Sequence, residues 1–279
     1  MKQKKRMTFK WHHLYLAFVF ILLYIPIFYL IFYSFNAGGN MTKFTGFTLE
    51  HYQAMFADTR LLSITLDTFL LAFLSACIAT IIGTFGAMGI HYTKKRGVRQ
   101  TFLSLNNILM VSPDVIIGAS FLILFTFLGT WFGFQLGFMS VLLSHIAFSI
   151  PIVVLMVLPK MQEMNPSLID AARDLGANNW QVLRQIILPF LTPGIIAGYF
   201  MAFTYSLDDF AVTFFVTGNG FSTLSVEIYS RARQGISLEI NALSTMLFLF
   251  SLILVTGYYF ISKENRPKHK KKKNKKMER

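Results

Sequence analysis

The chain has 279 residues, of which 54% are hydrophobic and 14% charged, and its 26 Lys and Arg against 13 Asp and Glu give a formal net charge of +13. Soluble globular domains carry about 25% charged residues, so this composition excludes an ordinary soluble domain. The single cysteine, Cys77, excludes a disulfide framework or a cysteine metal cluster within the chain.

Six apolar segments follow one another along the sequence. They cover residues 14–35, 63–90, 103–128, 138–158, 191–215 and 242–261. An α-helix needs about 20 apolar residues to cross about 30 Å of hydrocarbon, so we predict an all-α integral membrane protein with six transmembrane helices. The first segment lacks a cleavage site and is expected to be an uncleaved span. Ser112-Pro113-Asp114 interrupts the third segment and indicates a kink or a break.

Positive charge is distributed unevenly between the spans. Most Lys and Arg lie in the amino-terminal arm 1–13, the second-to-third connection, the loop 159–190 and the tail 262–279. Cytoplasmic loops retain Lys and Arg, so both termini are expected to be cytoplasmic. The segments 36–62 and 216–240 are then expected on the outer face. The basic arms are expected to contact anionic membrane lipid and not nucleic acid.

The loop 159–190 contains the start and stop signals of two short helices. Ser167 is expected to be an N-cap, with Asp170 completing a capping box three residues later. Gly176 is expected to end the first helix, because glycine accepts the left-handed backbone conformation at a C-terminal cap. The second helix is expected to start near Asn179 and to end at Pro189.

Helices of this length are not stable alone in water, so each must dock on a surface. The sequence allows two possible docking surfaces. One is formed by the chain's own spans, and the other belongs to a cytoplasmic partner. The small side chains of Ala171 and Ala172 would allow such a partner to approach closely.

Seven residues of this loop also form a spaced motif. They are Asp170, Ala171, Ala172, Gly176, Ile186, Leu188 and Pro189. The motif resembles the EAA loop of type I ABC importer permeases, with aspartate at position 170 where that family usually has glutamate. The resemblance implies a MetI-like permease fold. It also implies that these residues form a coupling loop that docks on an ATP-binding subunit dimer.

Further motifs extend the likeness from the first span to about residue 261. They lie at residues 24–27, 34–36, 112–114, 136–138, 144–146, 206–209 and 215–218. Together they resemble spermidine/putrescine permease subunits of the PotC type. The resemblance implies a permease core over residues 63–261 in a bacterial inner (plasma) membrane. It also implies a second permease subunit, an extracytoplasmic polyamine-binding protein and polyamine cargo.

Four carboxylates lie within the apolar segments. They are Asp67, Asp114, Asp208 and Asp209. Charged groups at membrane depth are costly and normally face a bundle interior or an aqueous path. Asp114, Asp208 and Asp209 are therefore candidates for lining a translocation path for a cation. Tyr205, about one turn before the aspartate pair, could add a cation–π contact to that path.

Each carboxylate also has a structural alternative. Asp114 follows a proline and suits the first turn of a restarted helix. Asp67 lies near the outer end of its span, where water can reach it. Asp208 and Asp209 would point about 100° apart on a helix, so one could line the path while the other bonds a neighbouring helix.

Two further features are expected to serve packing. His145 is expected to be a hydrogen-bonded interior residue, with a proton relay as the alternative. Gly83, Gly86 and Gly89 form a small-residue stripe that would let helices approach closely.

The sequence contains no Gly-x-x-x-x-Gly-Lys-Ser/Thr motif, so this chain does not cradle nucleotide phosphates in the P-loop manner. We expect a non-hydrolysing subunit that binds no cofactor or metal, with ATP and Mg²⁺ on the partner ATPase. An ion-coupled secondary transporter or channel for a small organic cation is the alternative, with Asp208, Asp209 and His145 binding the ion or proton. A membrane scaffold would leave the buried carboxylates without a purpose.

Overall fold

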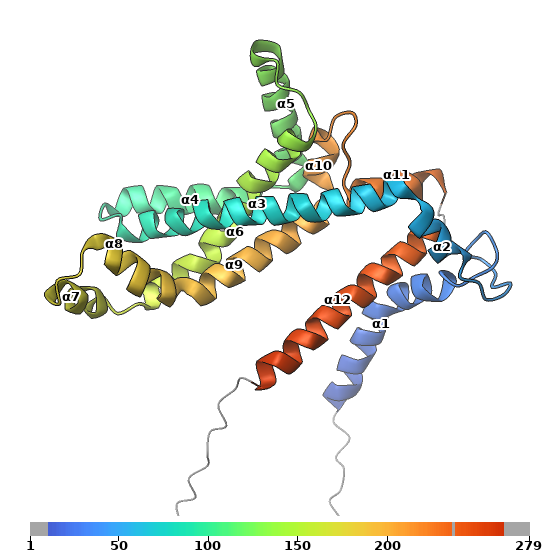
Figure 1. The fold of residues 1–279 in the computed structure, drawn as a ribbon, viewed down its shortest axis with the longest axis horizontal. Coiled ribbons are helices and arrows are strands. Elements are labelled where there is room, and N and C mark those ends of the chain that lie inside the picture. Colours follow the sequence, from blue (N-terminus) through green and yellow to red (C-terminus); the bar gives the residue numbers. More distant parts are fainter. Residues whose placement is uncertain (1–10, 236–237, 265–279) are drawn as a thin grey trace, which may run out of the picture. The chain divides into compact units, whose positions relative to one another are not determined.

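The computed structural model describes residues 11–235 and 238–264, in which the regular elements are helices (Figure 1). The chain divides into two compact units. Unit 1 combines Met1–Asp58 with Gly235–Arg279, and unit 2 is Thr59–Gln234.

The described part of unit 1 contains three helices, α1 (Trp11–Tyr33), α2 (Glu50–Ala57) and α12 (Leu238–Glu264). α12 packs against both α1 and α2. An edge-on aromatic contact joins α1 to α12, because the rings of Tyr24 and Phe248 lie 6.4 Å apart between centroids.

Asn36 organises the segment between α1 and α2. Its side-chain nitrogen donates to the carbonyls of Asn40 and Lys43, each at 2.9 Å, and its side-chain oxygen accepts from the Thr45 N–H at 2.8 Å. Asn36 is fully buried, so these bonds replace the water that its amide has lost. The segment predicted as external, 36–62, therefore contains an ordered turn and α2.

Unit 2 is a helical bundle built around α3, α6 and α9. Its elements are α3 (Thr59–Tyr92), α4 (Arg96–Val111), α5 (Asp114–Phe132), α6 (Phe138–Glu163), α7 (Ser167–Asp174), α8 (Asn179–Val182), the π-helical turn η1 (Leu183–Ile187), α9 (Leu188–Asp208), α10 (Ala211–Val216) and α11 (Leu224–Gln234). α6 packs against both α3 and α9 and is the most buried of the long apolar helices. It forms the centre of the unit.

Two glycines let α3 and α9 approach α6 closely. A β-carbon on Gly83 would lie 2.7 Å from Val153 Cβ, and one on Gly198 would lie 3.2 Å from Val153 Cγ1. Gly83 thus makes the predicted close contact. The predicted close approach is wrong for Gly89, where a β-carbon would meet no atom within 4 Å. At Gly86 a β-carbon would make only an ordinary contact, 3.8 Å from Val154 Cγ2. Steps of three residues drift by about 60° around a helix, so the three glycines do not share one face.

Five of the described helical segments are long and apolar enough to cross a membrane. They are His13–Tyr33, Thr59–Tyr92, Asp114–Phe132, Phe138–Glu163 and Asn179–Asp208. In α12 the apolar part assigned among the described residues is the shorter stretch Leu238–Ile253. The count of six spans and the cytoplasmic placement of the termini stay predictions.

The third predicted span, 103–128, consists of two helices, which confirms the interruption expected at Ser112-Pro113-Asp114. α4 ends at Val111 and α5 starts at Asp114, so the chain breaks where Ser112-Pro113 was expected to kink or break it. Both residues have extended backbone ψ angles, 136° at Ser112 and 132° at Pro113. The residue before a proline avoids the helical region, which explains why the break falls there.

The fifth predicted span, 191–215, is wrong at both ends. α8, η1 and α9 continue from Asn179 to Asp208, so the helix runs through Pro189 and does not end there. The wide turn η1 precedes the proline, with Leu188 N–H bonded to the Leu183 carbonyl. A π-helical turn is a usual site at which the backbone hydrogen-bond pattern of a helix shifts and the helix can bend. At the other end, Asp209 is extended and α10 is a separate helix.

Candidate functional site

The helix that carries the spaced motif, α7, does not start as expected. The Ser167 side chain makes no cap; instead Ser167 N–H donates to Asn165 Oδ1 at 3.1 Å. Pro166 already has helical angles, so it occupies the first-turn position and Asn165 supplies the cap. The predicted Ser167–Asp170 capping box is therefore wrong.

The end of α7 at Gly176 confirms the prediction. Gly176 has φ +85°, the left-handed region. Its N–H donates to the Arg173 carbonyl at 2.9 Å, and Ala177 N–H donates to the Ala172 carbonyl at 3.0 Å. This pair of bonds is the Schellman motif, which satisfies carbonyls left open at a helix end. A β-carbon on Gly176 would meet nothing within 4 Å, so glycine is required by backbone conformation and not by space.

The two faces of α7 have different surroundings. Ile169 and Ala172 of α7, and Ala177 just after its cap, pack against the core cluster that contains Ile90 and Met161. The helix therefore docks on its own chain through this face. Ala171 and Asp170 are exposed. Docking on the chain's own spans is therefore shown for the face with Ala172, whereas docking of a partner on the exposed face with Ala171 stays a prediction.

Apolar side chains around α7 remain exposed. Leu175 is 89% exposed, Trp180 65% and Leu168 46%. Single exposed apolar residues are common, whereas several around one short helix indicate an interaction surface. We call Leu168, Ala171, Leu175 and Trp180 the α7 surface.

The rest of the motif lies in the junction between the loop and a span. α8 starts at Asn179 as predicted, through a capping box in which Asn178 accepts from Gln181 N–H at 2.9 Å and Gln181 accepts from Asn178 N–H at 2.8 Å. Ile186 lies in η1, and Leu188 and Pro189 open α9. These three residues therefore connect α7 and α8 to the long helix.

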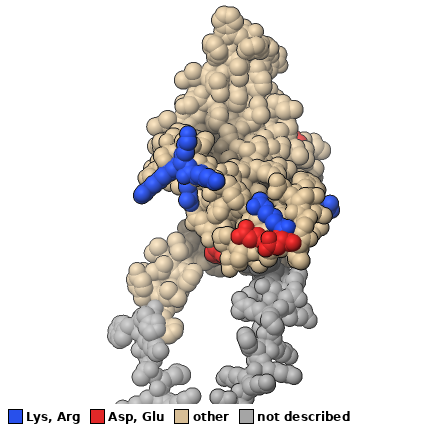
Figure 2. All heavy atoms as spheres, turned by 90° about the vertical axis from the view of Figure 1, so that its left-hand side faces the viewer, with Lys and Arg blue, Asp and Glu red and all other residues tan. Residues whose placement is uncertain are grey.

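The α7 surface lies at the same end of unit 2 as the turn between α3 and α4 (Figure 1). That turn carries Lys94 and Lys95, and the first turn of α4 adds Arg96 and Arg99. Figure 2 shows this end face-on, with one group of Lys and Arg and a second group in which acidic and basic side chains are mixed. Strong positive charge at one end of the unit fits the orientation predicted from the sequence.

A second candidate region is a buried polar cluster centred on His145 of α6. His145 is fully buried, with Nδ1 2.6 Å from Ser206 Oγ and Nε2 2.9 Å from Thr213 Oγ1. Ser206 Oγ also makes a hydrogen bond with Ser75 Oγ of α3, at 2.9 Å. The cluster thus links three core helices to α10, as expected of a hydrogen-bonded interior histidine.

Asp209 completes this cluster from the break between α9 and α10. Its Oδ2 accepts from the hydroxyl of Thr213 at 2.7 Å and from Thr213 N–H at 2.9 Å, and lies 3.5 Å from His145 Nε2. The Asp209 side chain is only 7% exposed. Because the Thr213 hydroxyl donates to the carboxylate, its oxygen is free to accept from His145 Nε2–H. Asp209 therefore fixes the start of α10 and the tautomer of the histidine.

The other path candidates are more accessible. Tyr205 donates its hydroxyl to Asp114 Oδ1 at 2.9 Å, which joins α9 to the first turn of α5. Asp114, Tyr205 and Asp208 are all exposed in the chain. The structure thus brings Asp114 and Tyr205 together and separates the roles of Asp208 and Asp209. Sequence reasoning missed Ser75, Ser206 and Thr213 as bonding partners, since common hydroxyl residues give no local signal.

Among the described residues, no group of three or more His, Cys, Asp or Glu side chains could hold a metal ion. The structure instead combines a bundle of membrane-length helices with polar groups inside it. A capped surface helix, α7, lies between α6 and α9 in the sequence. These features are those of a polytopic membrane protein.

The chain belongs to the family of binding-protein-dependent transport system inner membrane components, whose family model matches residues 79–267. It is 38% identical over 247 residues to the spermidine/putrescine transport system permease protein PotC of Escherichia coli strain K12, across 88% of this chain and 91% of the relative. It is 34% identical over 240 residues to the putrescine transport system permease protein PotI of the same strain, across 85% of each.

A solved bacterial ABC transporter involved in the import of the acidic polysaccharide alginate has the same fold, with a TM-score of 0.71 and 18% identity over 92% of this chain and 96% of that chain. The predicted all-α, MetI-like permease fold is therefore confirmed. The chain is a permease subunit of an ABC importer and a multi-pass protein of the bacterial inner membrane.

Proposed function

We propose that this chain and a second permease subunit together form the alternating-access path through which an ATP-driven importer takes up polyamines. The observation that carries the proposal is the α7 surface, which stays exposed although the opposite face of α7 is anchored in the core. Relatives named as spermidine/putrescine and putrescine permeases support the substrate class.

In this proposal the α7 surface docks on an ATP-binding subunit, and ATP with Mg²⁺ is bound there. Asp170, Ala171, Ala172 and Gly176 form the coupling helix and its cap. A displacement of α7 would pass through Ile169 and Ala172 to the core cluster shared by α3, α6 and α9. Packed cores transmit such shifts because they resist compression.

Ile186, Leu188 and Pro189 would provide a second route from the same loop. They lie in one continuous helical run with α9, which extends to Asp208. A displacement of α8 would therefore be transmitted along α9 as far as Asp208 without an intervening loop. We propose that this connection is the role of the Ile-x-Leu-Pro part of the motif.

The proposed path is lined by Asp114, Tyr205 and Asp208. Their carboxylates and aromatic ring suit the ammonium groups of a polyamine in sign and chemistry. Asp209 faces the His145 cluster instead and would hold the α9–α10 break in place. An extracytoplasmic binding protein would deliver the polyamine at the end of the bundle opposite α7.

Uptake of labelled spermidine and putrescine into proteoliposomes tests the proposal. The vesicles contain both permease subunits and the ATPase, with Mg-ATP in the lumen and the polyamine-binding protein outside. We expect accumulation that requires both ATP hydrolysis and the binding protein, so a non-hydrolysable ATP analogue and omission of this chain should each abolish it. Uptake that runs on an ion gradient without ATP would instead establish the secondary transporter.

A further inference from the structure

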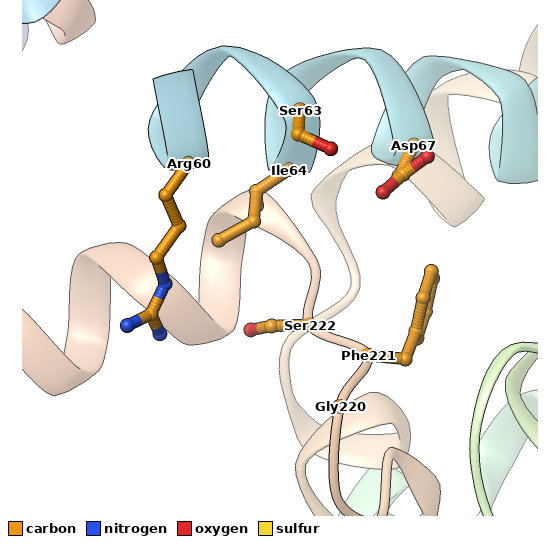
Figure 3. Close-up of a pocket in the computed structure, with 7 residues that line it drawn as sticks. All are labelled: Arg60, Ser63, Ile64, Asp67, Gly220, Phe221 and Ser222. Atoms are coloured by element: carbon orange, nitrogen blue, oxygen red, sulfur yellow. The ribbon is translucent and has the colours of Figure 1, made fainter. Parts of the chain in front are cut away.

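A pocket lies at the amino-terminal end of α3 (Figure 3). The α7 surface lies near the other end of that helix (Figure 1). Its volume is about 350 Å³, and its walls come from α3 and from the loop between α10 and α11. The lining residues are Arg60, Ser63, Ile64, Asp67, Gly220, Phe221 and Ser222. The volume falls at the lower end of the range found for small-molecule sites, about 300–1,000 Å³.

Two contacts hold the walls of this pocket together. Leu224 N–H donates to the buried Thr68 Oγ1 at 2.9 Å, which joins α11 to α3 directly beside the pocket. Arg60 Nη2 lies 3.2 Å from Glu227 Oε2, and Arg231 Nε lies 2.8 Å from the other oxygen of the same carboxylate. These contacts fix α11 relative to α3, and the loop that lines the pocket leads directly into α11.

The charges within the pocket are separated. Arg60 is paired with Glu227, whereas Asp67 makes no hydrogen bond or ion pair in the part of the chain that the structure describes. Asp67 is half-buried. Figure 3 shows Asp67 and Phe221 facing each other at one end of the pocket and Arg60 at the other. A half-buried carboxylate opposite an aromatic ring is a favourable environment for an organic cation.

The helix that carries Asp67 is longer than the hydrocarbon core is thick. The 34 residues of α3 span about 51 Å at 1.5 Å per residue, well beyond the roughly 30 Å thickness of the hydrocarbon core. Asp67 lies in the third turn of this helix. With the predicted orientation, the pocket opens at the extracytoplasmic end, where cargo arrives.

We propose that this pocket is a capture site for one ammonium end of the incoming polyamine, with Asp67 as the counter-ion and the Phe221 ring as a cation–π partner. This inference rests on the proposed function for the identity of the cation. Arg60 at the far end repels a second ammonium group from the pocket, so the remainder of the flexible chain points out. The site would therefore bind one amine and leave the rest of the polyamine free to move on.

Charge-selective labelling tests the pocket independently of transport. Ser63, which lines the pocket and is exposed, is replaced by cysteine in a Cys77→Ser background of the assembled transporter. We expect a trimethylammonium methanethiosulfonate to react faster than its sulfonate counterpart, and free spermidine to slow the reaction. Asp67→Asn should lower the cation-to-anion rate ratio about fivefold and remove the spermidine protection.

Glu50→Gln is the matched control, because it neutralises an exposed acid that does not line the pocket. It should leave the rate ratio unchanged, and Asp67→Glu should restore most of it. An unchanged ratio and undiminished spermidine protection in Asp67→Asn would overturn the capture site.

Polyamine uptake with the same variants separates this inference from the proposed function. If the wild type transports polyamine, we expect slower uptake by Asp67→Asn at saturating binding protein and normal uptake by Glu50→Gln. Normal uptake by Asp67→Asn with an unchanged labelling ratio would refute the pocket and leave the importer intact. If the wild type transports no polyamine, the proposed function fails, and spermidine protection of the cysteine alone decides whether the pocket binds the amine.

Discussion

Replacement of Gly176 by valine is expected to abolish most ATP-driven uptake while the membrane subunit still folds. The Schellman bonds require φ +85° at this position, and a β-branched residue strongly disfavours that conformation. The left-handed conformation costs about 1–2 kcal/mol for an ordinary residue, which lowers the equilibrium constant for forming the capped helix about 5- to 30-fold. Uptake and ATP hydrolysis, measured in the same vesicles, would show the two activities becoming uncoupled.

Gly176→Asn is the control for this effect. Asparagine tolerates the left-handed region better than other residues with side chains, and a β-carbon meets no atom within 4 Å here. Gly176→Asn should therefore retain much of the uptake. Equal loss in both variants would mean that the glycine serves a close contact with another subunit, and full activity in Gly176→Val would contradict the coupling role of α7.

Truncation of Asp209 should destabilise the subunit, whereas truncation of its neighbour should not. Asp209→Ala removes the acceptor for Thr213 N–H and the carboxylate beside the fully buried His145. A buried polar group left without its hydrogen-bond partner costs about 1–3 kcal/mol. Thermal unfolding in detergent should show a clear drop for Asp209→Ala.

Asp208→Ala provides the matched comparison on the adjacent residue. Asp208 is exposed, so its loss should leave the unfolding midpoint unchanged and reduce polyamine uptake. If Asp209→Ala is as stable as the wild type, the account of the His145 cluster is wrong. If Asp208→Ala transports normally, Asp208 does not line the path.

Local sequence signals predicted several starts and ends of helices correctly. Gly176 ends α7, Asn179 starts α8 and Ser112-Pro113 separates two helices, because each depends on backbone conformation within a few residues. The start of α7 was missed because Asn165 and Ser167 are both good cap residues. The helical angles of Pro166 decide between them.

Contacts between distant residues were beyond local reasoning. Tyr205 bonds Asp114, 91 residues away, and the carboxylate beside His145 comes from the α9–α10 break and not from its own helix. The pairing of Asp67 with Phe221 in one pocket depends likewise on how α3 packs against the α10–α11 loop. Hydrophobic periodicity also could not show that η1 would carry a helix through Pro189.

The central claim is that the α7 surface receives the ATPase. A photoreactive phenylalanine analogue at Leu175, which is 89% exposed, tests this in the assembled transporter. The same analogue at Ile123 of α5, 71% exposed on a membrane-length helix, serves as the control. We predict that irradiation joins the Leu175 variant to the ATP-binding subunit and leaves the Ile123 variant unattached to it. Capture of the ATPase from Ile123 but not from Leu175 would contradict the account.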